Sequence, residues 1–193
     1  MKTTYFFGEG KADGNATEKN LLGGKGANLA EMTNLGIPVP PGFTISTEIC
    51  KYYLNKNAYP NEFDVDIQNA LNQIENIMEQ TFGDENNPLL ISIRSGARQS
   101  MPGMMETILN VGLTSKTIPG LIKQTKDEHF VFDAYRRLIT MYADVVMEKA
   151  GGIEPSDGNS IREKFDAIME TMKIEEGLKE VEDFSINNLK KLC

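Results

Sequence analysis

Four residues near the start of the chain have the chemistry to bind phosphate: Gly23, Gly24, Lys25 and Gly26. Glycines let the backbone approach an anion closely and direct successive N–H groups toward it. A short helix is predicted to start at Ala27, and its N-terminus would add partial positive charge to the full charge of Lys25. The spacing is not that of a P-loop. By themselves, the four residues also fit a loop that needs glycine merely to turn.

Two arginines, Arg94 and Arg98, lie at and just beyond the end of a predicted strand. Ligands of open α/β sheets gather at such strand ends, and a guanidinium group can bind phosphate oxygens through two parallel hydrogen bonds. Surface arginines commonly pair with carboxylates or water instead. Residues 86–105 contain no acidic side chain, however, which favours an anion site.

The loop after these arginines is rich in methionine and contains a Pro-Gly pair, in residues 100–107. Methionine side chains are flexible and polarisable. Two interpretations remain open for this loop. It is either a mobile apolar flap over a base or phosphate chain, or a core loop filled by soft side chains.

The remaining polar groups give no sign of catalysis. His129, the single histidine, lies in the first turn of a predicted helix without a serine or cysteine nucleophile nearby, and we expect it to be a structural residue at or near the surface. No cysteine or histidine spacing suggests a zinc site. Arg136 and Arg137 are expected on a solvated helix face, and Cys50 is expected to be buried.

The elements that position these groups predict an α+β fold. The front part, residues 1–112, mixes strands and helices around glycine-rich loops, and residues 113–193 read as a helical subdomain. The predicted strands are 4–7, 43–46, 89–95 (mostly buried) and 107–111. The predicted helices are 27–36, 47–55, 64–82, 127–150, 158–172 and 185–192.

The bulk composition excludes several classes of protein. The chain of 193 residues is 40% hydrophobic, which is enough for a core, and its net charge of −8 argues against general affinity for nucleic acid or anionic membranes. No apolar run approaches the ~18–20 residues that span a bilayer. Two cysteines and no signal peptide at the N-terminus favour a reduced, cytoplasmic protein.

Three blocks of sequence resemble the pyruvate phosphate dikinase family. They are NLLGGKGANLAEM at residues 20–32, GIPVPPGF at 36–43 and SIRSGARQSMPGMMETILNVGL at 92–113. The third block is the most specific, because the related phosphoenolpyruvate synthases usually lack its Met-Pro-Gly-Met-Met run. The resemblance covers residues 4–150 well, and the helical remainder agrees with it in character.

The resemblance implies an ATP-grasp-like nucleotide-binding subdomain with a mixed sheet. It also implies an enzyme that converts ATP, phosphate and pyruvate to AMP, diphosphate and phosphoenolpyruvate, with magnesium, through a phosphohistidine relay. Lys25 and Arg94 match the family's phosphate-contacting positions and Arg98 matches a further nucleotide contact. Gly103 and Thr107 lie in a loop that the family places near the phosphates.

The resemblance also implies what this chain lacks. The relay histidine, the acidic magnesium ligands and the pyruvate-binding barrel have no counterpart here, and His129 does not match the relay position. We therefore expect a truncated chain that is inactive by itself, with no catalytic residue and no metal ligand of its own, from an enzyme that is commonly a homodimer. Two alternatives stay open: a phosphoenolpyruvate synthase-type dikinase, and a nucleotide-binding module without catalysis.

Overall fold

The computed structural model describes residues 2–96, 107–153 and 158–193. They form two compact units. One contains the described residues up to Gln80 together with Ser95 and Gly96, and the other contains Thr81–Arg94 and the described residues from Thr107 onward. The chain therefore passes between the units three times, after Gln80, after Arg94 and again between Gly96 and Thr107. The predicted α+β class is confirmed, while the predicted division at residue 112 stays a prediction.

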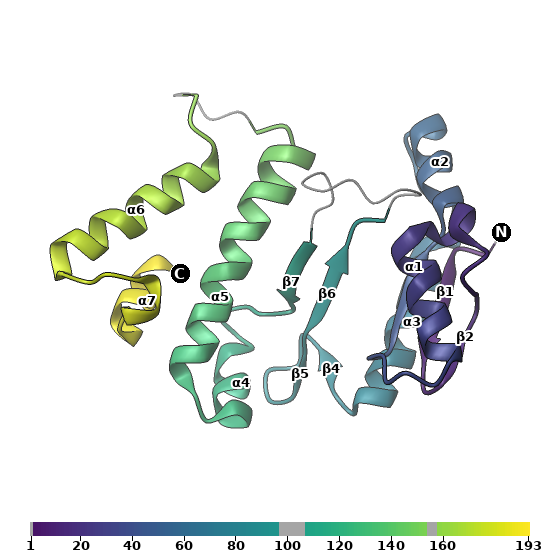
Figure 1. Ribbon diagram of the computed structural model, residues 1–193, viewed down its shortest axis with the longest axis horizontal. Helices are drawn as coiled ribbons and strands as arrows, with labels where there is room; N and C mark the ends of the chain where they lie inside the picture. The colour runs from purple at the N-terminus through teal and green to yellow at the C-terminus, as the bar shows by residue number, and fades with distance from the viewer. Residues whose placement is uncertain (1, 97–106, 154–157) are drawn as a thin grey trace. The chain divides into compact units, whose positions relative to one another are not determined.

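The first unit is a small antiparallel sheet with three helices (Figure 1). Its strands are β1 (Thr4–Gly8), β2 (Lys11–Ala12) and β3 (Gly42–Ile45), in the order β2-β1-β3. Its helices are α1 (Lys19–Asn34), α2 (Thr47–Lys56) and α3 (Phe63–Met78).

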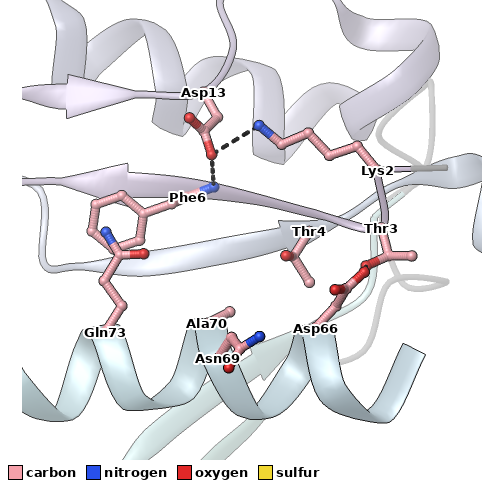
Figure 2. A pocket seen from close by; sticks show the side chains of 9 residues that line it. All are labelled: Lys2, Thr3, Thr4, Phe6, Asp13, Asp66, Asn69, Ala70 and Gln73. Atoms are coloured by element: carbon pink, nitrogen blue, oxygen red, sulfur yellow. Dashed lines mark hydrogen bonds and ion pairs between the residues drawn. The ribbon is translucent and has the colours of Figure 1, made fainter. Parts of the chain in front are cut away.

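Helices α1 and α3 both pack on this sheet. Side chains alternate between the faces of a strand, so Thr4 and Phe6 of β1 point toward one face, where they lie beside α3 (Figure 2). Phe7 points to the other face, and Thr44 of β3, the strand partner of Tyr5, contacts α1 on that face. The sheet is therefore held between α1 and α3, and the buried apolar residues of both helices cover it, including Ala27, Ala30, Ala70 and Ile74.

The second unit contains two short strand pairs and a series of helices (Figure 1). Strands β4 (Thr81–Phe82) and β5 (Pro88–Leu89) are parallel, and β6 (Ile91–Arg94) and β7 (Thr107–Val111) are antiparallel. The helices are α4 (Ile118–Thr125), α5 (Glu128–Tyr142), the π-helix η1 (Ala143–Ala150), α6 (Ile161–Glu176), the 3₁₀ turn η2 (Val181–Asp183) and α7 (Ile186–Leu192).

Helix α5 organises the core of this unit. Val131, Ala134 and Leu138 are buried on one face of α5, in a cluster with Ile108 of β7 and Leu121 of α4. A second cluster joins Met169 of α6 to Phe184, Leu189 and Leu192, and the half-buried Phe132 of α5 packs against it. The amphipathic stripe that predicted a helix over 127–150 is thus confirmed, although its last eight residues are a π-helix.

Three predictions about the elements are wrong. Helix α3 ends at Met78, not near residue 82, because Glu79 takes a left-handed conformation (φ 54°) and Thr81 and Phe82 form β4. The predicted strand 89–95 is not mostly buried, since Ile93 is 51% exposed and Arg94 is also exposed. Cys50 is exposed as well, because it faces away from the single buried side of α2, at Ile49.

Candidate phosphate-binding site

The glycine turn is a kink inside α1. Gly23 has φ 70° and ψ 171°, which interrupts the helix, and regular helical geometry resumes at Gly24. The predicted start at Ala27 is therefore wrong, because α1 begins at Lys19 and its segment after the kink begins at Gly24. The conformation of Gly23 is essentially restricted to glycine, so at this position the glycine has a backbone role.

This kink creates a new helix start around Lys25. The first N–H groups of a helical segment have no carbonyl partner within that segment, and Gly24, Lys25 and Gly26 occupy its first turn. The side chain of Lys25 is half-buried, and within the described part of the chain it forms no ion pair. A cation without an ionic partner at the start of a helical segment is the arrangement that an anion site requires, and the role of Lys25 in such a site stays a prediction.

Gly26 has a packing role in addition. A Cβ atom built on Gly26 would lie 2.7 Å from Cγ2 and 2.8 Å from Oγ1 of Thr44 in β3. The absence of a side chain therefore lets α1 approach the sheet closely. Gly26 is therefore needed for packing and Gly23 for the turn, while phosphate binding by this segment stays a prediction.

In the second unit, Arg94 and Thr107 are brought together. They are strand partners at the end of the β6–β7 ladder, and directly opposed residues of an antiparallel pair project to the same face. Arg94 is exposed, and within the described residues no carboxylate pairs with it. Arg98 and Gly103 lie outside the described residues.

Arg136, Arg137 and His129 form contacts within the second unit. Arg136 donates to Asp133 Oδ1 over 2.7 Å and its side chain is 12% exposed, so the predicted solvated position of Arg136 is wrong. Arg137, which is exposed, binds Asp133 Oδ2 over 2.6 Å. His129 Nε2 lies 2.7 Å from the carbonyl oxygen of Phe184, which confirms the structural role expected for it.

A shallow hollow of about 390 Å³ lies between β1 and α3 (Figure 2). Its lysine, Lys2, is paired with Asp13 over 3.1 Å, and Asp13 also accepts a hydrogen bond of 3.0 Å from the N–H of Phe6. None of the predicted phosphate-binding residues lines this hollow. Because its cation is already neutralised, it does not have the character of a phosphate site.

The described residues contain neither a candidate metal cluster nor a candidate membrane-spanning helix. They contain no group of three or more His, Cys, Asp or Glu side chains that could hold a metal ion. No described helix is both long and apolar enough to cross a membrane.

Sequence reasoning missed two residues that support the glycine turn, Thr44 and Thr47. Thr44 packs against Gly26, and the hydroxyl of Thr47 donates to the carbonyl of Asn20 over 2.6 Å. They lie around the start of α2, about 20 residues from the turn in sequence. No local pattern links the two segments, and the contact could be found only from the packing of α1 and α2.

Known proteins with similar sequences point to one family. The family model for the pyruvate phosphate dikinase AMP/ATP-binding domain matches residues 19–62, which contain the whole glycine turn. The pyruvate, phosphate dikinase of Rickettsia conorii is 41% identical over 192 residues, or 99% of this chain and 21% of its own length. That of Clostridium symbiosum is 45% identical over 94% of this chain and 20% of its own length.

A plant relative agrees with the bacterial ones. The chloroplastic pyruvate, phosphate dikinase 1 of Zea mays is 44% identical over 99% of this chain and 19% of its own length. The similarity thus extends through the helical part that follows residue 150, and the chain spans about a fifth of the length of these relatives. By this similarity the chain belongs to the pyruvate phosphate dikinase family, and its residues 19–62 match the model of that family's AMP/ATP-binding domain.

Proposed function

We propose that this chain binds ATP as part of a pyruvate phosphate dikinase, which converts ATP, phosphate and pyruvate to AMP, diphosphate and phosphoenolpyruvate. The observation that carries the proposal is the kink at Gly23. It starts a helical segment at Lys25, which forms no ion pair with any described residue, inside the segment that matches the family's AMP/ATP-binding domain. The N-terminus of a helical segment can bind polyphosphate through its free N–H groups and the positive end of its dipole.

Five residues are proposed to contact the nucleotide: Lys25, Arg94, Arg98, Gly103 and Thr107. The ammonium group of Lys25 and the guanidinium groups would neutralise phosphate oxygens, and the hydroxyl of Thr107 would donate a hydrogen bond to one of them. Their task is to hold the polyphosphate in the orientation that in-line attack requires and to stabilise charge as it develops. None of these residues is proposed to form a covalent bond.

The fold assignment is part of the same proposal. We assign residues 1–112 to an ATP-grasp-like subdomain and residues 113–193 to a helical subdomain that follows it. The mixture of short strands and helices in both units is compatible with this assignment.

The remaining parts of the reaction are assigned to the whole protein, since the chain spans about a fifth of its relatives. We propose that the relay histidine, the magnesium ligands, the pyruvate site and the homodimer contacts belong to other residues of the whole protein. We also propose a cytoplasmic location. Both cysteines are free thiols, which fits a reducing compartment, although the maize relative is named chloroplastic.

The proposal is tested with Lys25→Ala, with Lys56→Ala as the matched control, because Lys56 is an exposed lysine in the last turn of α2. In a protein of the relatives' length that contains this chain, Lys25→Ala is expected to reduce ATP-dependent phosphoenolpyruvate formation at least tenfold, while Lys56→Ala keeps normal activity. Equal activity of the two variants would contradict the assignment of Lys25.

Two alternatives are separated by product analysis in the same assay. Diphosphate that forms only with added phosphate indicates the dikinase, and release of free phosphate from the β-position with water as acceptor indicates a phosphoenolpyruvate synthase. Binding of ATP without any turnover in the full-length protein would indicate a nucleotide-binding module. The names of the relatives favour the dikinase.

A further inference from the structure

We propose that Thr47 is a positioning residue for the glycine turn, because its hydroxyl fixes the helical segment that leads into the kink. The inference rests on the proposed phosphate-binding role of Lys25 and deepens it. Thr47 itself is not proposed to touch the ligand.

The hydroxyl of Thr47 gives a hydrogen-bond donor to a backbone carbonyl of α1 just before the kink. Oγ1 of Thr47 donates to the carbonyl oxygen of Asn20 over 2.6 Å. Asn20 belongs to the short helical stretch that ends at Gly23, where the non-helical backbone interrupts regular geometry. The last carbonyls of a helical segment lack partners within that segment, so the Thr47 hydroxyl satisfies a group that the kink leaves exposed to competition from water.

A second contact fixes α1 on the other side of the kink. Gly26 lies against Thr44 so closely that a methyl group would not fit between them. Thr44 lies near the end of β3 and Thr47 is the first residue of α2. This junction of β3 and α2 thus touches α1 both before Gly23 and after Lys25. Two points of contact that bracket a bend define its angle.

The junction that makes these contacts is itself anchored. Ser46, between Thr44 and Thr47, is 1% exposed, and its N–H donates to the carbonyl oxygen of Thr3 over 3.0 Å. Ile49, one turn into α2, is 2% exposed. The hydroxyl of Thr47 therefore extends from a buried and hydrogen-bonded backbone, which lets it hold a neighbour in place.

The consequence for phosphate binding follows from the nature of glycine. Gly23 and Gly24 have access to many backbone conformations, so the kink itself does not specify one direction for Lys25 or for the N–H groups of the first turn. Preorganised donors bind an anion more tightly than donors that must be ordered first. Loss of the Thr47 hydrogen bond should thus weaken phosphate binding without removing any group that touches phosphate.

The matched control for Thr47 is Thr33. Its hydroxyl also donates to a backbone carbonyl of α1, that of Leu29 over 2.8 Å, and Thr33 is 1% exposed at the far end of the same helix. Thr33→Val and Thr47→Val remove the same chemical group from the same unit. Any effect that comes merely from destabilising α1 should appear in both variants.

The experiment titrates the 193-residue chain with inorganic tripolyphosphate and with ATP, and follows the amide signals of Gly24 and Gly26 by NMR. Thr47→Val is expected to shift both amide signals in the free protein and to weaken tripolyphosphate binding about 3- to 10-fold, the size of one net hydrogen bond. Thr47→Ser should restore both properties, and Thr33→Val should change neither.

The outcomes separate the two proposals. If Lys25→Ala abolishes tripolyphosphate binding while Thr47→Val binds like the unaltered chain, the positioning role is wrong and the phosphate site stands. If tripolyphosphate binds equally well with and without Lys25, or does not bind at all, the proposed function fails, and the role of Thr47 in it fails too. Equal losses in Thr47→Val and Thr33→Val would also overturn the inference.

Discussion

Arg94 and Thr107 are strand partners at the end of the β6–β7 ladder, and their side chains therefore project to the same face of the hairpin. The residues that separate them in sequence include Arg98 and Gly103. Two of the proposed nucleotide contacts thus flank the segment that carries two others. The register of β6 and β7 fixes where that segment begins and ends.

Replacement of Arg94 by alanine tests this part of the proposed site. Loss of charged hydrogen bonds to phosphate, at about 1.5–3 kcal/mol, corresponds to an affinity for ATP about 10- to 100-fold weaker. Calorimetry on the full-length protein measures the loss. The control is Arg162→Ala, since Arg162 is an exposed arginine on α6 that lies 4.0 Å from Asp166. Similar affinities in both variants would remove Arg94 from the site.

Gly26 and Thr44 provide a test of the packing beneath the turn. Gly26→Ala places a methyl group against both side-chain branches of Thr44, and such overpacking costs about 1–3 kcal/mol. Thermal unfolding should show a lower Tm for Gly26→Ala. Gly26→Ala should lower the Tm less when Thr44 has already been replaced by alanine than when Thr44 is present. Purely additive effects would show that the two residues do not meet.

Gly23→Ala tests the kink directly. Gly23 has φ 70° and ψ 171°, and an alanine in this conformation carries strain of about 1–3 kcal/mol. The backbone either keeps this strain or changes its conformation. Urea unfolding should show the loss of stability, and the affinity for tripolyphosphate should fall at the same time because the turn changes shape. An alanine variant with unaltered stability and affinity would mean that the turn does not adopt this conformation in solution.

Cys193 reports on the packing of the C-terminal helix. Partial burial raises the pKa of its thiol to about 11; the positive charge of Arg136 opposes this rise, and the negative charge of Asp133 adds to it. Both cysteines are exposed. Because the raised pKa leaves little thiolate at Cys193 at pH 8, Cys193 should react with iodoacetamide more slowly than Cys50. His129→Ala removes the 2.7 Å contact with Phe184 and should accelerate the reaction of Cys193 but not that of Cys50.

The sign of the same pKa shift predicts an effect of high pH. A pKa raised from 9.0 in the unfolded chain to about 11 in the folded one contributes stability that is complete below pH 9. The contribution is lost as the pH rises from 9 to 11. Cys193→Ser should have a flatter stability profile over that range in chemical unfolding experiments. An identical profile would show that the thiol is already solvated.

Asp13 gives a corresponding test in acid. Burial raises its pKa, but hydrogen bonds from the N–H of Phe6 and from Lys2 outweigh burial, and the net pKa lies below its ordinary value of 3.8. The stabilisation is thus present above pH 3.8 and is lost as the pH falls through the folded-state pKa. NMR titration of Lys2→Met should show the pKa of Asp13 closer to the ordinary value. An unchanged titration would contradict the ion pair.

Sequence patterns predicted helices correctly where apolar residues recur at helical spacing on a buried face. The apolar stripe located α5 because Val131, Ala134 and Leu138 pack in one cluster with residues of β7 and α4, although Phe130 at its start is exposed. The end of α3 was placed too late, because Thr81 and Phe82 join a strand pair whose partner, Pro88–Leu89, lies beyond a turn. Local patterns cannot show such pairing.

The candidate site was predictable in part for a related reason. The chemistry of Lys25 and Arg94 is visible in their residue types and in their glycine-rich or acid-free surroundings. The kink at Gly23 and the support from Thr44 and Thr47 depend on how α1 meets β3 and α2. The buried position of Arg136 likewise depends on α6, whose Met169 lies 3.5 Å from its guanidinium group.

The π-helix that continues α5 has a consequence for side-chain order. In an α-helix, residues three or four apart are neighbours, whereas the i→i+5 bonds of a π-helix bring residues five apart onto one side. Asp144 and Lys149 have that spacing and form an ion pair of 3.2 Å. Glu148, on the same turn, accepts a hydrogen bond of 2.6 Å from the N–H of Ile161 at the start of α6. Rewinding this segment as an α-helix would separate the ion pair and turn Glu148 away from α6, so the wide turns of η1 determine which of its side chains meets the start of α6.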